Sequence, residues 1–239
     1  MAASRRRFTQ VKKIGTPDAM SEYLAEQDID LQLDDTVEPA PEGPLAEPMA
    51  IGQRLRAGNR FAILPMEGWD GTTDGMTTPD LERRWLRFGA SGAGMVWGEA
   101  TSVTPEGRAN PNQLMINERT AESLGRLRSR MAAARARDFD GADLVTGLQL
   151  THSGRWSRPF GEPLPRIAYR HTQLDGRVPV SDASVLSDDE LDELVGIYVQ
   201  AGILAADAGF DFVDIKHCHG YLLHELLSAR TRPGRYGGS

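Results

Sequence analysis

From Asn59 onward, short apolar runs alternate with longer segments of helical pattern. The apolar runs predict strands at 60–66, 94–100, 144–150 and 210–215. The segments between them predict helices at 78–91, 117–136 and 187–209. Strands that alternate with helices form parallel sheets, because each helix carries the chain back to the start of the next strand. The pattern therefore predicts an α/β fold.

Local signals support the expected helix ends. Thr78 is followed by Pro79, and Ser187 is followed three residues later by Glu190. Both are typical helix starts, with a capping hydroxyl and then a first-turn proline or a capping-box glutamate. Gly209 marks the expected end of the third helix.

The first part of the chain has a different character. Thr16 and Pro17 predict a helix start, and the acidic, proline-bearing stretch DDTVEPAPEGPLAEP predicts a linker. We expect residues 1–44 to form an N-terminal extension with a linker, and residues 45–239 to form the main domain.

An open sheet and a closed barrel would both fit this alternation. A dinucleotide-binding open sheet would place G-x-G-x-x-G after its first strand, and PMEGWDGTTDGM lacks that motif. Polar side chains recur instead at the expected strand ends, namely Glu67, Glu99, Gln149, Lys216 and His219. A (β/α)₈ barrel builds its active site there. We expect about the first four of eight βα units, and hence half of a TIM barrel.

Composition excludes some classes of partner. The net charge is −7, so no global basic field exists for nucleic acid or anionic lipid. No apolar run approaches the length of a membrane span. The chain has one cysteine, which rules out an intrachain disulfide and favours a cytoplasmic location.

The segment DIKHCHGYLLHELL concentrates reactive side chains. His217, His219 and His224 could ligate zinc, but their spacing matches no familiar structural zinc motif. Cys218 could be a nucleophile, although a lone cysteine is more often a small buried apolar residue. A set of hydrogen-bond donors around a ligand is the third interpretation.

Four segments in order and at the right spacing resemble one family. They are IGQRLRAGNRFAILPM, GAGMVWGEATSVTPEGR, GLQLTHSGR and GFDFVDIKHCHGYLLHELLSARTRPGRYGGS. Between about Pro48 and Ser239 the chain is similar to the N-terminal half of the Old Yellow Enzyme, or NADH:flavin oxidoreductase, family. The resemblance implies a flavoprotein with an FMN-binding (β/α)₈ barrel.

The resemblance also implies the residues that contact FMN. They are Pro65, Met66, Glu67, Ala100 and Gln149. A primary amide such as that of Gln149 offers a donor and an acceptor, which suits the edge of an isoalloxazine ring. Without the resemblance, a core amide satisfied by neighbouring backbone would be an equally good interpretation of Gln149.

On the substrate side, the resemblance implies that Lys216 and His219 donate hydrogen bonds and that Tyr221 is the proton donor. Trp69 would line the substrate pocket. The implied activity is NAD(P)H-driven reduction of an activated alkene by hydride from flavin N5, with NADH or NADPH as reductant. Alternatives are an amine dehydrogenase or demethylase of the same fold, and a non-catalytic binding module. The resemblance is compatible with a homo-oligomer of the full-length protein.

Three positions depart from the family pattern. Lys216 replaces the usual first donor, Glu67 stands where many relatives have Thr or Cys, and RTRPGRYGGS lacks residues common before Tyr-Gly-Gly. Lys216 would either meet a ligand or pair with Asp214 or Glu99. We expect Arg155 to hold the long loop at 152–186 rather than to touch a ligand.

Overall fold

The chain forms two compact units, Met1–Ala46 and Glu47–Ser239. The structure is a computed structural model that describes residues 8–34, 36–139 and 143–238. Residues 1–7 and 35 of the expected N-terminal extension therefore lie outside the described residues. Within the described ranges, no helix is both long enough and apolar enough to cross a membrane.

The first unit contains a short 3₁₀ helix, η1 (Val11–Lys13), and one α-helix, α1 (Pro17–Glu26). The hydroxyl of Thr16 accepts a hydrogen bond from the amide of Ala19 at 3.2 Å. The helix start predicted from Thr16 and Pro17 is confirmed, because the hydroxyl satisfies an amide that the helix itself leaves free.

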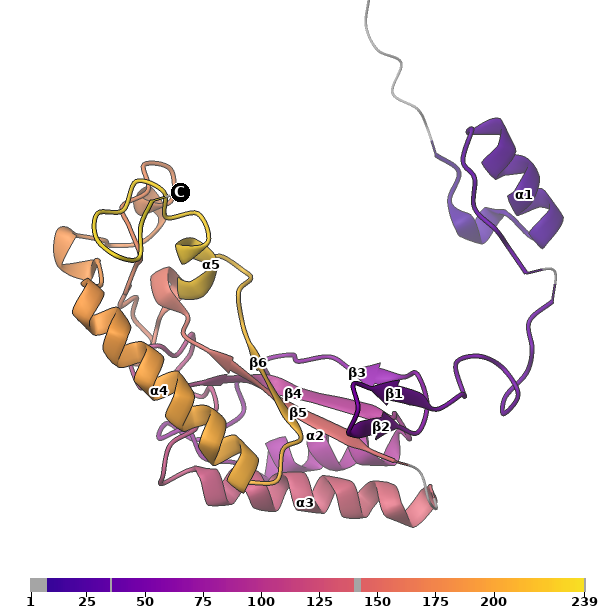
Figure 1. Cartoon of the computed structure of the whole chain (residues 1–239), viewed down its shortest axis with the longest axis horizontal. Coiled ribbons are helices and arrows are strands. Elements are labelled where there is room, and N and C mark those ends of the chain that lie inside the picture. Colours follow the sequence, from indigo (N-terminus) through magenta and orange to yellow (C-terminus); the bar gives the residue numbers. More distant parts are fainter. Residues whose placement is uncertain (1–7, 35, 140–142, 239) are drawn as a thin grey trace, which may run out of the picture. The chain divides into compact units, whose positions relative to one another are not determined.

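The second unit is built on a parallel sheet (Figure 1). Its strands are β3 (Ala62–Ile63), β4 (Met95–Ser102), β5 (Val145–Thr151) and β6 (Phe212–Ile215), paired in the order β3-β4-β5-β6. A separate antiparallel pair, β1 (Met49–Ile51) and β2 (Leu55–Ala57), precedes them. The sheet contains the four predicted strands in sequence order, as the first half of a (β/α)₈ barrel requires. The β1–β2 pair was not among the predicted elements.

A helix follows each strand of the sheet. These helices are α2 (Pro79–Ala90), α3 (Ala121–Asp138), α4 (Asp188–Asp207) and α5 (Leu222–Leu226). Thr78 caps α2 by accepting from the amide of Leu81 at 3.2 Å, and Ser187 and Glu190 form a complete capping box on α4. Gly209 ends α4 with φ +91°, a conformation that glycine adopts without a steric penalty.

Two elements differ from the sequence prediction by more than two residues at one end. Strand β3 covers two residues rather than 60–66, because Pro65 has no N–H to extend the ladder and the chain then leaves the sheet. Helix α3 begins at Ala121 rather than at 117. The side chain of Asn117 accepts from the amides of Arg119 and Thr120, at 2.9 and 3.1 Å, and holds residues 117–120 in a turn.

Helices α2, α3 and α4 cover one face of the sheet (Figure 1). Leu81, Trp85, Met131, Val96, Leu148 and Leu150 are fully or almost fully buried between the helix layer and the strands. On the other face, the rings of Trp97 and Phe212 meet edge to face at 5.7 Å. Gly147 lies between them in register, and a Cβ there would overlap the Phe212 ring.

Part of the helix layer and of β6 is exposed. Val195, Val199 and Ile203 on α4 are about half exposed, at 53, 59 and 49%. Val213 and Ile215 on β6 are 37 and 44% exposed. In a complete barrel, the strand and helix of a fifth βα unit would pack against such positions.

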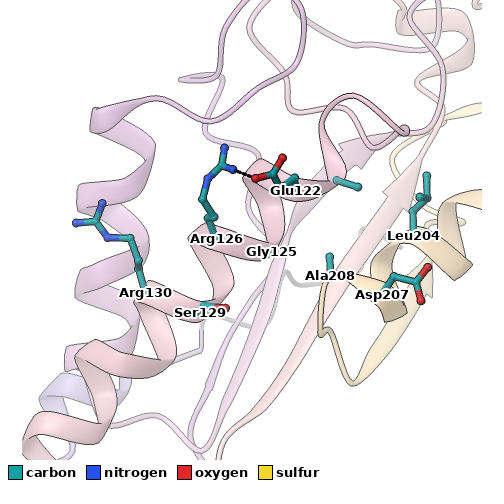
Figure 2. A pocket seen from close by; sticks show the side chains of 9 residues that line it. Glu122, Gly125, Arg126, Ser129, Arg130, Leu204, Asp207 and Ala208 are labelled. Atoms are coloured by element: carbon teal, nitrogen blue, oxygen red, sulfur yellow. Dashed lines mark hydrogen bonds and ion pairs between the residues drawn. The ribbon is translucent and has the colours of Figure 1, made fainter.

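A groove of about 640 Å³ lies between α3 and α4 (Figure 2). Glu122 and Arg126 form an ion pair on its rim, and Arg130 pairs with Glu82 of the neighbouring helix α2. The groove belongs to the outer helix layer, whereas the polar residues singled out in the sequence belong to the strand ends.

Candidate functional site

The carboxyl ends of the parallel strands bring three polar or small residues into one row. Ala100 on β4 is in register with Gln149 on β5, which is in register with Asp214 on β6. The Nε2 of Gln149 donates to the Oδ2 of Asp214 at 2.6 Å. Ala100 is completely buried, and its carbonyl accepts from the side chain of Gln113 at 3.0 Å. This row forms the floor of the candidate site.

The segment after β3 is held over the sheet by Glu99. One oxygen of Glu99 accepts from the amide of Gly68 at 3.0 Å. The other accepts from Arg84 at 2.8 Å and from the indole of Trp85 at 3.0 Å. Burial raises the pKa of Glu99, and the nearby Arg84 opposes that rise. Glu99 is thus an anchor for the segment that carries the preceding residue, Glu67.

Residues 65–67 enter the site in different ways. Pro65 is half-buried, whereas Met66 is 76% exposed. The side chain of Glu67 is only 12% exposed and turns toward the strand ends. The roles of these three residues as FMN contacts stay predictions.

Glu67 is the centre of the candidate site. Its Oε1 accepts from the Nε1 of Trp69 at 2.9 Å. Its Oε2 lies 3.4 Å from the Nζ of Lys216 and accepts from the hydroxyl of Tyr221 at 3.3 Å. One carboxylate therefore gathers three of the four side chains that the sequence assigned to the substrate.

Lys216 lies one residue beyond β6 and is 5% exposed. Its ammonium group pairs with Glu67 and lies 4.4 Å from the centre of the Tyr221 ring. Of the two alternatives drawn from the sequence, a ligand contact of Lys216 stays a prediction, and a pair with Asp214 or Glu99 is wrong. Asp214 is bonded to Gln149, and Glu99 is bonded to Arg84, so the long lysine side chain reaches the carboxylate of the β3 segment instead.

Tyr221 is placed by the turn between β6 and α5. His219 and Gly220 both have positive φ, +61° and +68°, and the amide of Tyr221 donates to the carbonyl of Cys218 at 3.2 Å. Burial, followed by the adjacent Glu67 carboxylate, raises the pKa of Tyr221. The phenol is therefore a protonated donor at neutral pH.

His219 lies beside Tyr221. Its ring meets the Tyr221 ring edge to face, with the two centres 6.1 Å apart, and the imidazole is exposed. Trp69 is 51% exposed and has φ +51°. The structure thus gathers Lys216, Tyr221 and Trp69 around Glu67, with His219 at the open side.

The other reactive residues of the segment have local partners or face outward. The Nδ1 of His217 lies 2.7 Å from the carbonyl of Ile215. The Nδ1 of His224 accepts from the amide of Gly220 at 2.8 Å. Cys218 is an exposed free thiol. These contacts favour the third interpretation of the segment, a set of donors, over a zinc or thiol centre.

Arg155 is completely buried and organises the long loop after β5, as the sequence predicted. Its guanidinium donates to Glu225 at 2.5 Å, to Asp175 at 2.5 Å and to the carbonyl of Tyr169 at 3.0 Å. The loop also contains η2 (Gly154–Trp156), η3 (Asp175–Arg177) and η4 (Asp182–Ser184). The bond to Glu225 joins this loop to α5, and the other two bonds hold the loop together internally.

Sequence reasoning singled out Glu67, Trp69, Lys216 and Tyr221 but did not predict that the last three meet the Glu67 carboxylate. One signal for this contact was available in the sequence. Glu67 and Lys216 each follow a strand, and the carboxyl ends of parallel strands lie at the same edge of the sheet. The two side chains nevertheless come from strands at opposite ends of the strand order. Their approach depends on the curvature of the sheet, which the residue pattern does not contain.

A family model described as the NADH:flavin oxidoreductase / NADH oxidase family matches residues 44–239. The chain is 29% identical over 185 residues to the NADPH dehydrogenase of Bacillus pumilus, covering 76% of this chain and 51% of that protein. The chain thus spans about half the length of the curated relatives that it matches.

Two solved structures agree in fold. The Old Yellow Enzyme homologue of Zymomonas mobilis matches with a TM-score of 0.65 and 28% identity, over 82% of this chain and 55% of that one. The Old Yellow Enzyme of Pichia sp. AKU4542 matches with a TM-score of 0.68 and 22% identity, over 84% of this chain and 53% of that one. The expected half of a (β/α)₈ barrel is confirmed. The chain belongs to the NADH:flavin oxidoreductase / NADH oxidase family.

Proposed function

We propose that this chain forms the N-terminal half of the catalytic barrel of an FMN-dependent oxidoreductase. The whole protein would use NADH or NADPH to reduce alkenes that are conjugated to a carbonyl or nitro group. The observation that carries the proposal is the cluster of Lys216, Tyr221 and Glu67 at the carboxyl ends of the strands. Such ends are where (β/α)₈ barrels place their chemistry.

The residues at the strand ends fit the ring of FMN. The amide of Gln149 is held by Asp214 and offers both a donor and an acceptor, which an isoalloxazine edge requires. Ala100, in register beside it, adds only a methyl group to this part of the strand ends. The exposed side chain of Met66 supplies apolar surface. Pro65, Met66, Glu67, Ala100 and Gln149 would together hold the ring.

When bound, FMN supplies hydride transfer between the nicotinamide and the alkene. Lys216 and His219 would donate hydrogen bonds to the carbonyl or nitro oxygen of the substrate and stabilise the negative charge that develops there. Tyr221 would deliver a proton to the α-carbon as a general acid. Its 3.3 Å contact with Glu67 is at the long end of hydrogen bonding, so the hydroxyl can turn toward a substrate at small cost.

The proposal is tested on the longest form of the protein that its gene encodes. We expect the purified protein to show the visible absorption of bound flavin and to oxidise NADH or NADPH when an enone is added. Faster reduction by a tertiary amine than by a nicotinamide would identify an amine dehydrogenase instead. A colourless protein that takes up no FMN would contradict the proposal.

The 239-residue chain by itself is a useful comparison. In (β/α)₈ barrels the phosphate commonly sits on loops after the seventh and eighth strands, whereas the sheet here has four strands. We therefore expect isothermal titration of this chain with FMN to show weak binding. Tight, stoichiometric binding by a monomer would show that these four strands suffice.

A further inference from the structure

The Glu67 carboxylate joins two segments that are far apart in the sequence: the stretch after β3, which also carries Trp69, and the stretch between β6 and α5, which carries Lys216 and Tyr221. Trp69 follows β3, Lys216 follows β6, and Tyr221 precedes α5. All three side chains contact this one carboxylate, at 2.9, 3.4 and 3.3 Å respectively. A side chain that served only to contact a cofactor would need no such set of partners.

The charges around Glu67 balance. The side chains of Lys216 and Glu67 are 4 and 12% exposed, so one ammonium and one carboxylate face each other with little water between them. The neighbouring carboxylates are engaged elsewhere, Asp214 with Gln149 and Glu99 with Arg84. Lys216 therefore presents no uncompensated positive charge to a ligand.

We propose that Glu67 is a positioning residue that makes this site select uncharged ligands over anions. It cancels the charge of Lys216 and holds Tyr221 as a neutral hydrogen-bond donor. The ligand part of this inference rests on the function proposed above, whereas the effect on Tyr221 is a property of the chain itself.

The groups around Tyr221 explain why Glu67 controls the ionisation of its hydroxyl. Glu67 faces the phenol from the segment after β3, Lys216 from the end of β6, and Cys218 and His219 from the turn before α5. Ser153, which follows β5, is the remaining polar neighbour. A carboxylate beside the hydroxyl opposes its ionisation, and an ammonium group beside the ring favours it. Loss of the carboxylate alone would leave the ammonium group unopposed.

The first experiment follows the ionisation of Tyr221 and needs no flavin. The chain is labelled with tyrosine carrying ¹³C at Cζ, and Tyr221→Phe assigns the resonance. In the wild type we expect Tyr221 to remain protonated at about pH 10, where an ordinary tyrosine is half ionised. In Glu67→Gln, which keeps the shape but removes the charge, the midpoint should fall by about one unit or more.

Two variants control this measurement. Glu67→Asp keeps the charge, so Tyr221 should remain protonated as in the wild type. Glu122→Gln removes the same charge from the α3 surface, where Glu122 pairs with Arg126 (Figure 2), and should have no effect. Circular dichroism is used to check whether each variant is folded. The same Tyr221 midpoint in wild type and Glu67→Gln would overturn the inference, and if Glu67→Gln does not fold, half-ionisation of Tyr221 at about pH 10 in the wild type would do so.

The second experiment measures the ligand preference of the FMN-loaded, longest form of the protein. The probe is 4-nitrophenol, which changes between neutral and anionic forms near neutral pH. The wild type should bind the neutral form more tightly, and Glu67→Gln should gain affinity for the anion by about tenfold or more. Equal preference in both proteins would overturn the inference even if the enzyme is active. A protein that binds no flavin would contradict the proposed function while leaving the Tyr221 result valid.

Discussion

Two buried charged clusters in the same unit differ in how completely their members are paired. The Arg155 cluster ties the loop after β5 to α5, with two ionic bonds of 2.5 Å and a third bond to a backbone carbonyl. The Glu67 cluster lies at the strand ends, and its contacts with Lys216 and Tyr221 are 3.4 and 3.3 Å long.

The acids of the Arg155 cluster are also held by the backbone. Glu225 accepts from the amide of Ala168 at 3.0 Å, and Asp175 accepts from the amide of His171 at 3.1 Å. The Glu67 carboxylate instead meets an indole, an ammonium group and a phenol, all of which belong to side chains. The short bonds and backbone contacts of the Arg155 cluster fit a structural role. The longer contacts of the Glu67 cluster surround a phenol whose pKa is raised, which fits a candidate site for chemistry.

The largest expected effect is a loss of unfolding free energy when the Arg155 cluster is broken. Arg155→Met removes the cation and leaves the buried Glu225 without its charged partner, whereas Asp175 keeps its pair with Arg170. Loss of one member of a buried ion pair costs about 3–5 kcal/mol, so denaturant unfolding should show a decrease of that size. Arg158→Met changes an exposed arginine of the same loop and should have almost no effect. A small loss for Arg155→Met would remove the distinction between the two clusters.

Substitution of Tyr221 in the Glu67 cluster should change the rate of the reaction rather than the stability of the fold. Tyr221→Phe removes only the hydroxyl, and general acid catalysis contributes roughly 10²–10⁴-fold. In stopped-flow experiments on the FMN-loaded, longest form of the protein, reoxidation of the flavin by an enone should slow accordingly, while its reduction by a nicotinamide stays nearly unchanged. Tyr236→Phe, on the far C-terminal loop, should change neither. Equal losses in both half-reactions would contradict the role of Tyr221 as proton donor.

The third effect is the pH dependence of stability near the Arg155 cluster. Burial, assisted by Arg166 and opposed by Glu106, lowers the pKa of His152 from 6.5 to about 4. The unfolded chain therefore binds a proton between these two values while the folded chain does not, so stability falls as the pH drops from 6.5 toward 4. The decrease amounts to about 3 kcal/mol at most.

The pH dependence is measured by denaturant unfolding of the wild type and of His152→Asn. The difference between their unfolding free energies should change across this pH range. His217→Asn, which alters an exposed histidine, should keep the slope of the wild type. Parallel curves for the wild type and His152→Asn would mean that His152 is not held neutral.

The smallest effect is expected for the Lys216–Glu67 pair. Lys216→Met keeps the packing of a long side chain against the Tyr221 ring, and Glu67 retains its bonds to Trp69 and Tyr221. We expect a loss of about 1 kcal/mol, well below that of Arg155→Met. In a double-mutant cycle with Glu67→Gln, the two changes should not add, because they remove the same contact. Additive losses would show that the 3.4 Å contact carries no energy.

The sequence by itself determined the elements with strong local signals. Thr78, Ser187 and Gly209 predicted helix ends correctly, because a cap depends on residues within one turn of the chain. The four strands and their parallel order followed from the alternation of apolar runs and helices. The placement of Lys216 and Gln149 at strand ends followed from the same pattern.

Only the tertiary structure decided which of these residues meet. In a flat sheet, β3 and β6 would be three strand spacings apart, or roughly 14 Å. The curved sheet and the segment after β3, held by Glu99, bring Glu67 to 3.4 Å from Lys216 instead. Asp214 is the carboxylate closest to Lys216 in the sequence, but it is hydrogen-bonded to Gln149 on the next strand. Curvature and cross-strand partners arise from packing between residues far apart in sequence, so local periodicity could not reveal them.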